Sequence, residues 1–166
     1  MKKLKLLLID DDPLILKGMG SYLKKKGFQM TTAGSGEKAV ELLDKSAFDL
    51  VITDLVMEQV NGIRVLQKSK EVNPETMNII LTGHGNLDSA INALKLGADD
   101  YILKPCNTEE MLSRISACFE KLELKRKIKL TKLALQESDE KLLIFKTIIE
   151  SSEEAIAISE PGGQLI

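Results

Sequence analysis

Acidic side chains follow two short apolar runs, one near the start of the chain and one near its middle. Asp10 and Asp11 follow the run 4–9, and Asp54 follows the run 50–52 after one threonine. Three carboxylates that lie close together repel one another unless a cation sits among them, and hard oxygen ligands of this kind suit Mg²⁺. A carboxylate can also act as a nucleophile and form an aspartyl phosphate. These residues therefore predict a magnesium-dependent phosphoryl-acceptor site, provided that the fold brings them together.

Two further polar residues stand at the ends of later apolar runs. Thr82 follows the run 77–81, and Lys104 follows the run 101–103. A hydroxyl group and an ammonium group can hold phosphoryl oxygens by a hydrogen bond and by charge. Taken one at a time, an aspartate after a strand is usually a helix N-cap, and a threonine there is usually a turn former. Four run ends with matching chemistry favour one shared site instead.

The first two thirds of the chain alternates short apolar runs with helical patterns. Strands are predicted at 4–9, 28–32, 49–53, 77–81 and 101–103, and helices at 13–26, 37–45, 63–71, 87–96 and from about 107 onward. Strands that are apolar throughout are buried on both faces, so helices must cover both faces of a parallel sheet. The predicted fold class is a doubly wound α/β sheet. Its strands share one carboxyl edge, which is where such sheets bind ligands.

The last predicted helix has no obvious end, because no proline or glycine occurs between residues 111 and 151. One interpretation is a solvated helix that rests on its own domain, but a domain of this size cannot cover so long a helix. We therefore favour a parallel coiled coil and a homodimer through this helix. The heptad positions, in alternating steps of four and three residues, are Leu124, Ile128, Thr131, Leu135, Ser138, Leu142, Phe145 and Ile149.

Bulk composition argues against several classes of function. The chain has 23 basic and 25 acidic residues, a net charge of −2 and no tryptophan, so nothing indicates nucleic acid or an anionic membrane as a partner. The apolar run after the basic N-terminus is too short for a signal peptide, and no stretch reaches membrane-spanning length. Cys106 and Cys118 have no metal-type spacing, and we expect reduced thiols in a cytoplasmic protein.

Residues 4–122 resemble the receiver domain of two-component response regulators. The resemblance rests on four segments in the family's order, LIDDDP at 8–13, LVITDLVM at 50–57, LTGHG at 81–85 and GADDYILKP at 97–105. It implies a flavodoxin-like five-stranded sheet of order 2-1-3-4-5. It also implies that Asp54 accepts a phosphoryl group from a histidine kinase or phosphotransfer protein, a step that the receiver itself catalyses.

The resemblance also implies how the metal would be held. Asp11 and Asp54 would bind Mg²⁺ directly, together with the backbone carbonyl of Val56. Asp10 would contribute mainly through water. Val56 has no group that could orient an attacking water, so we expect a long-lived phosphoryl state.

Three other residues receive roles from the same resemblance. Lys104 would pair with a phosphoryl oxygen, Thr82 would swing to hydrogen-bond the phosphate, and Tyr101 would move inward behind it. This coupled shift would alter the face formed by the fourth helix, the fifth strand and the fifth helix. Glu58 departs from the family, which usually has proline after Met57, and this leaves the geometry of that loop open.

The end of the chain has a resemblance of its own. Residues 137–142 and 148–158 resemble the approach to a PAS sensory domain and its first strand, and the tail from Ile156 reads as a strand and a turn. The expected division is a receiver domain at 1–122, a helical coiled-coil linker at 123–152 and the truncated start of a PAS-like domain at 153–166. The resemblance implies a signal relayed to a downstream domain of a larger protein, such as a hybrid histidine kinase or an output enzyme.

Three other functions stay open on the sequence alone. A magnesium-dependent phosphatase of the haloacid-dehalogenase type would use the Asp-x-Asp spacing of Asp10 and Asp12, but it leaves Asp54 and Lys104 unexplained. A nucleotide-binding domain would need a glycine pattern, and the cluster at 34–36 matches neither the dinucleotide nor the P-loop type. A pure binding module would neither bind Mg²⁺ nor accept acetyl phosphate.

Overall fold

The computed structural model describes residues 4–83 and 87–159, and the chain divides into two compact units, Met1–Leu122 and Glu123–Ile166. The first unit alternates strands and helices as the apolar runs predict. The elements are β1 (Lys5–Ile9), α1 (Pro13–Lys25), β2 (Gln29–Ala33), α2 (Gly36–Lys45), β3 (Leu50–Asp54), α3 (Gly62–Val72), β4 (Met77–Thr82), α4 (Leu87–Lys95), β5 (Asp100–Leu103) and α5 (Thr108–Ser159).

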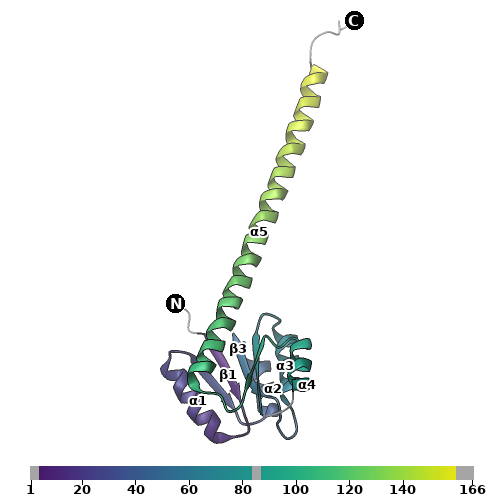
Figure 1. Ribbon diagram of the computed structural model, residues 1–166. Helices are drawn as coiled ribbons and strands as arrows, with labels where there is room; N and C mark the ends of the chain where they lie inside the picture. The colour runs from purple at the N-terminus through teal and green to yellow at the C-terminus, as the bar shows by residue number, and fades with distance from the viewer. Residues whose placement is uncertain (1–3, 84–86, 160–166) are drawn as a thin grey trace, which may run out of the picture. The chain divides into compact units, whose positions relative to one another are not determined.

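The five strands form one parallel sheet in the order β2-β1-β3-β4-β5. Figure 1 shows α1 and the beginning of α5 on one side of this sheet and α2, α3 and α4 on the other. The chain changes direction across the sheet between β1 and β3, the point where doubly wound folds place their ligands. The predicted fold class is confirmed.

Both faces of the sheet carry a hydrophobic core, which is why the central strands are apolar at almost every position. On the α1 and α5 side, Leu8, Ile52 and Leu81 pack against α5 side chains such as Ile115 and Phe119. On the opposite side, two further clusters join the sheet to α2, α3 and α4. Each fully buried side chain of this size contributes about 1.5–3 kcal/mol. The sheet is therefore a rigid frame for whatever its carboxyl edge carries.

Local signals set the ends of several helices. Asp12 caps α1, because its carboxylate accepts a hydrogen bond of 2.8 Å from the N–H of Leu14, and Pro13 occupies the first helical position. Gly97 follows α4 with a φ of +100°, a conformation that favours glycine. Both helix boundaries agree with the sequence prediction.

The second unit is helical throughout its described part, since α5 continues to Ser159. The prediction of a strand from Ile156 is wrong as far as Ser159, and residues 160–166 lie outside the described part of the chain. A strand needs a neighbouring strand for its backbone hydrogen bonds, whereas a helix satisfies them within itself. No helix in the described residues is long and apolar enough to cross a membrane.

Candidate functional site

The ends of β1 and β3 bring three carboxylates together. Asp10 follows β1 directly, Asp54 is the last residue of β3, and these two strands are hydrogen-bonded neighbours. One carboxylate oxygen each from Asp10, Asp11 and Asp54 lies within 4.8 Å of the other two. The predicted acidic cluster thus exists as a geometric fact at the carboxyl edge of the sheet.

Lys104 reaches into this cluster from the residue after β5. Its Nζ donates to Oδ2 of Asp10 at 2.6 Å and to Oδ2 of Asp54 at 2.5 Å. Burial by itself lowers the pKa of Lys104, but the hydrogen bonds and negative charges of Asp10 and Asp54 outweigh it and raise that pKa above its ordinary value. A protonated lysine therefore offsets the repulsion between two aspartates.

The orientation of the Asp54 side chain is fixed from both sides. Its Oδ1 accepts a hydrogen bond of 3.2 Å from the backbone N–H of Val56, and its Oδ2 is held by Lys104. Only 8% of Asp54 is exposed, whereas Val56 beside it is 70% exposed. The carboxylate is thus held in place and nearly buried, and the exposed residue beside it has no polar side chain.

The two aspartates after β1 differ in their surroundings. Asp10 has no exposed surface, and its Oδ1 accepts a hydrogen bond of 3.0 Å from the N–H of Asp12. Asp11 is exposed and lines a cavity of about 450 Å³ together with Glu37 and Glu58. Asp11 is thus open to solvent, while Asp10 is enclosed by the protein.

Thr82 and Tyr101 lie on one face of the sheet. Ile80 of β4 pairs with Tyr101 of β5, so their side chains lie on the same face of the sheet. Thr82 is two residues after Ile80 on β4, so its side chain points to that face as well. Thr82 is buried, and its hydroxyl donates to the carbonyl of Gly83 at 3.2 Å. Tyr101 is half-buried against the cluster that joins β4 to α3 and α4. The next loop residues, 84–86, lie outside the described part of the chain.

Gly62 is a site residue that the sequence did not identify as such. A Cβ atom at this position would lie 2.1 Å from the backbone carbonyl oxygen of Asp54. The N–H of Gly62 also donates to the carbonyl of Leu55 at 3.1 Å. The Asn61-Gly62 pair predicts a turn, but only the structure shows that glycine is needed for the close approach to the backbone of β3.

Comparisons with known proteins agree with this geometry. The response regulator receiver domain family matches residues 6–116. The transcriptional regulatory protein GlrR of Escherichia coli K12 is 35% identical over 115 residues, which are 69% of this chain and 26% of that relative. The transcriptional regulatory protein CpxR of the same strain is 39% identical over 113 residues, which are 68% of this chain and 48% of that relative.

Solved structures give the same likeness. The crystal structure of a response regulator receiver domain protein from Clostridium thermocellum superposes with a TM-score of 0.69 at 34% sequence identity. The match covers 73% of this chain and 98% of that one. The chain spans about a quarter of the length of GlrR and about half of that of CpxR.

Proposed function

The chain belongs to the response regulator receiver family of two-component systems, and from this premise we propose that Asp54 is the residue that accepts a phosphoryl group from a histidine kinase or phosphotransfer protein. The observation that carries the proposal is the convergence of three carboxylates and one lysine at a single strand edge. Asp54 ends the central strand of the sheet and is held in one orientation, as a nucleophile must be.

The transfer itself is a displacement at phosphorus. An oxygen of Asp54 forms the new P–O bond while the P–N bond of the donor phosphohistidine breaks, and the histidine nitrogen keeps the electron pair. Lys104 already lies against Oδ2 of Asp54, so its ammonium group would meet the incoming phosphoryl oxygens with a positive charge. Thr82 would supply a hydroxyl from the neighbouring strand β4.

The donor set fits Mg²⁺. Asp10, Asp11 and Asp54 provide oxygen ligands within 4.8 Å of one another, and hard oxygen donors are the ligands that this ion prefers. Asp11 and Asp54 would hold the ion directly with the carbonyl of Val56, and Asp10 would act through water. When bound, the ion would shield the carboxylates from the negative phosphoryl oxygens.

The surroundings of Asp10 disfavour the phosphatase alternative. That reaction would need a nucleophile directly after β1, and Asp10 has no exposed surface. Asp54 keeps 8% of its surface exposed, and because both carboxylates are hydrogen-bonded at both oxygens, access is what separates them. Asp54 is the better-placed nucleophile.

The test is phosphorylation by acetyl phosphate in the presence of Mg²⁺, followed by intact mass. We expect the wild-type chain to gain one phosphoryl group and Asp54→Asn to gain none while it keeps its circular dichroism spectrum. Asp12→Asn is the matched control, since asparagine also caps helices well and Asp12 is outside the carboxylate cluster. A phosphoryl group on Asp54→Asn, or none on the control, would refute the assignment.

We further propose that the signal leaves the receiver through Tyr101 and α5. The shared face of Thr82 and Tyr101 supports a coupled movement of the two side chains. Asp100, which is next to Tyr101 on β5, forms an ion pair of 3.1 Å with Arg114 of α5. This ion pair connects β5 to that helix. The helix would pass the change to an output segment of a larger protein, for which GlrR and CpxR, transcriptional regulatory proteins by name, offer one precedent.

The remaining part of the proposal is a parallel homodimer through the second unit. We define the seam as the heptad positions of α5 named above, of which six are large apolar residues that are 42–66% exposed. Pairing two such helices would remove on the order of 700 Å² of apolar surface from water, and the stems of neighbouring lysines would add to this area. This is an interface of modest size, which suits a weak, regulated dimer.

A further inference from the structure

The positions that flank the seam carry mostly one sign of charge. The alternating steps place Ile128, Leu135, Leu142 and Ile149 at heptad position a, which assigns the flanking positions e and g. Position e holds Lys125, Lys132, Asp139 and Lys146, and position g holds Lys127, Ala134, Lys141 and Ile148. Five of these eight residues are lysines, and Asp139 is the single acid. Lys125 would face Glu120 at the preceding position g, so the like-charge contacts come from the other four lysines.

In a parallel, in-register pair of helices, each g residue faces the e residue five positions later on the other helix. Lys127 would therefore face Lys132 of the second copy, and Lys141 would face Lys146 of the second copy. The two-fold symmetry repeats each contact on the other side of the seam. Lys146 also lies 3.8 Å from Glu150 of its own helix, so the contact between Lys127 and Lys132 is the more repulsive one.

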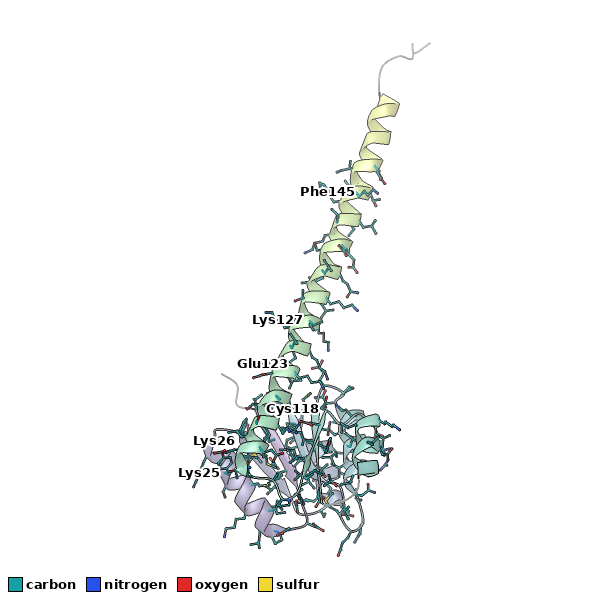
Figure 2. All side chains as sticks on the ribbon, in the orientation of Figure 1. Lys25, Lys26, Cys118, Glu123, Lys127 and Phe145 are labelled. Atoms are coloured by element: carbon teal, nitrogen blue, oxygen red, sulfur yellow. The ribbon has the colours of Figure 1, made fainter. Side chains whose placement is uncertain are left out.

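We propose that these lysine contacts restrain the parallel dimer, so that the two copies associate more tightly when salt or another source of anions screens them. The apolar seam, including Phe145 in Figure 2, provides the attraction, and the lysines beside it provide an opposing term that depends on ionic strength. The inference rests on the proposed homodimer and adds its electrostatic regulation.

Sedimentation equilibrium of the full chain at about 0.05 M and about 0.5 M sodium chloride tests the restraint. Exposed charge pairs are individually weak, but the dimer has four like-charge contacts, so we expect the dissociation constant to fall by roughly tenfold at the higher salt concentration. A dissociation constant that stays constant or rises with salt would overturn the proposal. A chain that remains monomeric at all salt and protein concentrations would instead refute the homodimer itself.

Lys132→Glu tests whether the lysines beside the seam cause the salt response, and whether the two helices are parallel or antiparallel. In the parallel dimer, the new carboxylate would face Lys127 of the second copy, so the variant should dimerise several-fold more tightly at low salt and lose most of its salt response. In an antiparallel pair with the same seam layers, the carboxylate would face Asp139 of the second copy, and the variant would dimerise less tightly. Weaker association of this variant would therefore contradict the proposal.

The matched control is Lys129→Glu, which makes the same charge change three residues earlier on the outer face of the helix, at position b. It should keep the wild-type dissociation constant at low salt within about twofold. An effect equal to that of Lys132→Glu would assign the salt response to net charge and overturn the placement of the restraint at the seam. Circular dichroism of both variants checks that helix content is unchanged.

Discussion

Lys104 provides the positive charge that compensates the carboxylates of Asp10 and Asp54. Its ammonium group separates Asp10 from Asp54, and about 20% of its side chain is exposed. In Lys104→Ala two buried carboxylates would face each other, so we expect a loss of about 1–3 kcal/mol in the free energy of unfolding without Mg²⁺. Added Mg²⁺ should still bind and should recover much of this loss, because it replaces the missing positive charge.

Urea unfolding with and without Mg²⁺ measures both effects. Lys68→Ala is the control, because Lys68 makes a surface ion pair of 2.7 Å with Asp44, and its loss should change stability by less than about 1 kcal/mol at either metal concentration. Equal responses of the two variants to Mg²⁺ would contradict the role given to Lys104.

Cys118 gives the first unit a dependence on alkaline pH. Burial, reinforced by the negative charges of Asp100 and Asp99, raises the pKa of this thiol from 9.0 to about 11. Because the folded pKa lies above the unfolded one, the protein loses stability as the pH rises between these values, by roughly 2–3 kcal/mol in total. Cys118→Ala should lack this component, so the stability advantage of the wild type should shrink from pH 8 to pH 11 in urea unfolding under reducing conditions. If the free energies of unfolding of the two proteins changed with pH by the same amount, this role of Cys118 would be disproved.

At the scale of the elements, the sequence predicts best where local chemistry decides the outcome. Asp12 and Pro13 mark the start of α1, and Gly97 marks the end of α4, because capping depends on neighbours along the chain. The carboxyl ends of β1 and β3 were expected to meet because all strands are parallel, and they do.

Features that depend on distant parts of the fold were not predictable in the same way. The contact of Gly62 with the carbonyl of Asp54 arises from how α3 returns toward β3, and no residue pattern records it. The sequence predicts only that Lys104 lies near the carboxylates, and the structure shows that its Nζ contacts two of them at once. The helix beyond Ile156 was missed because that segment resembles the first strand of a PAS domain, whereas a continued α5 satisfies its backbone hydrogen bonds locally.

Ser138 is the weakest layer of the proposed seam, because a hydroxyl at position d contributes little apolar surface. Ser138→Leu should therefore lower the dissociation constant of the dimer by about tenfold or more, since each buried leucine adds about 1.5–3 kcal/mol. Glu137→Leu, one residue away and outside the seam, is the control and should have a much smaller effect. Sedimentation equilibrium at fixed salt distinguishes them, and equal effects would argue against the assigned heptad positions.

At the scale of the whole molecule, the boundary between the units suggests where the chain can be divided. Leu122 is 1% exposed and belongs to the core of the first unit, whereas Leu124 is 59% exposed. A chain that ends at Glu123 should fold, keep its thermal midpoint within a few degrees and be monomeric. A chain that ends at Glu110 would lack Ile115, Phe119 and Leu122 and should not fold. Thermal circular dichroism and sedimentation give the answer, and a dimer of the chain ending at Glu123 would place the interface in the first unit.

The absent side chain at Gly62 has a consequence for how this protein tolerates random change. In a saturation library selected for phosphate acceptance, position 62 should admit almost nothing but glycine, since even a methyl group would push against the backbone of Asp54 at the end of β3. Glu58, four residues earlier and exposed, should accept many replacements. Two nearby codons, one in the segment after β3 and one at the start of α3, would thus show opposite tolerance, and that contrast would map the backbone contact.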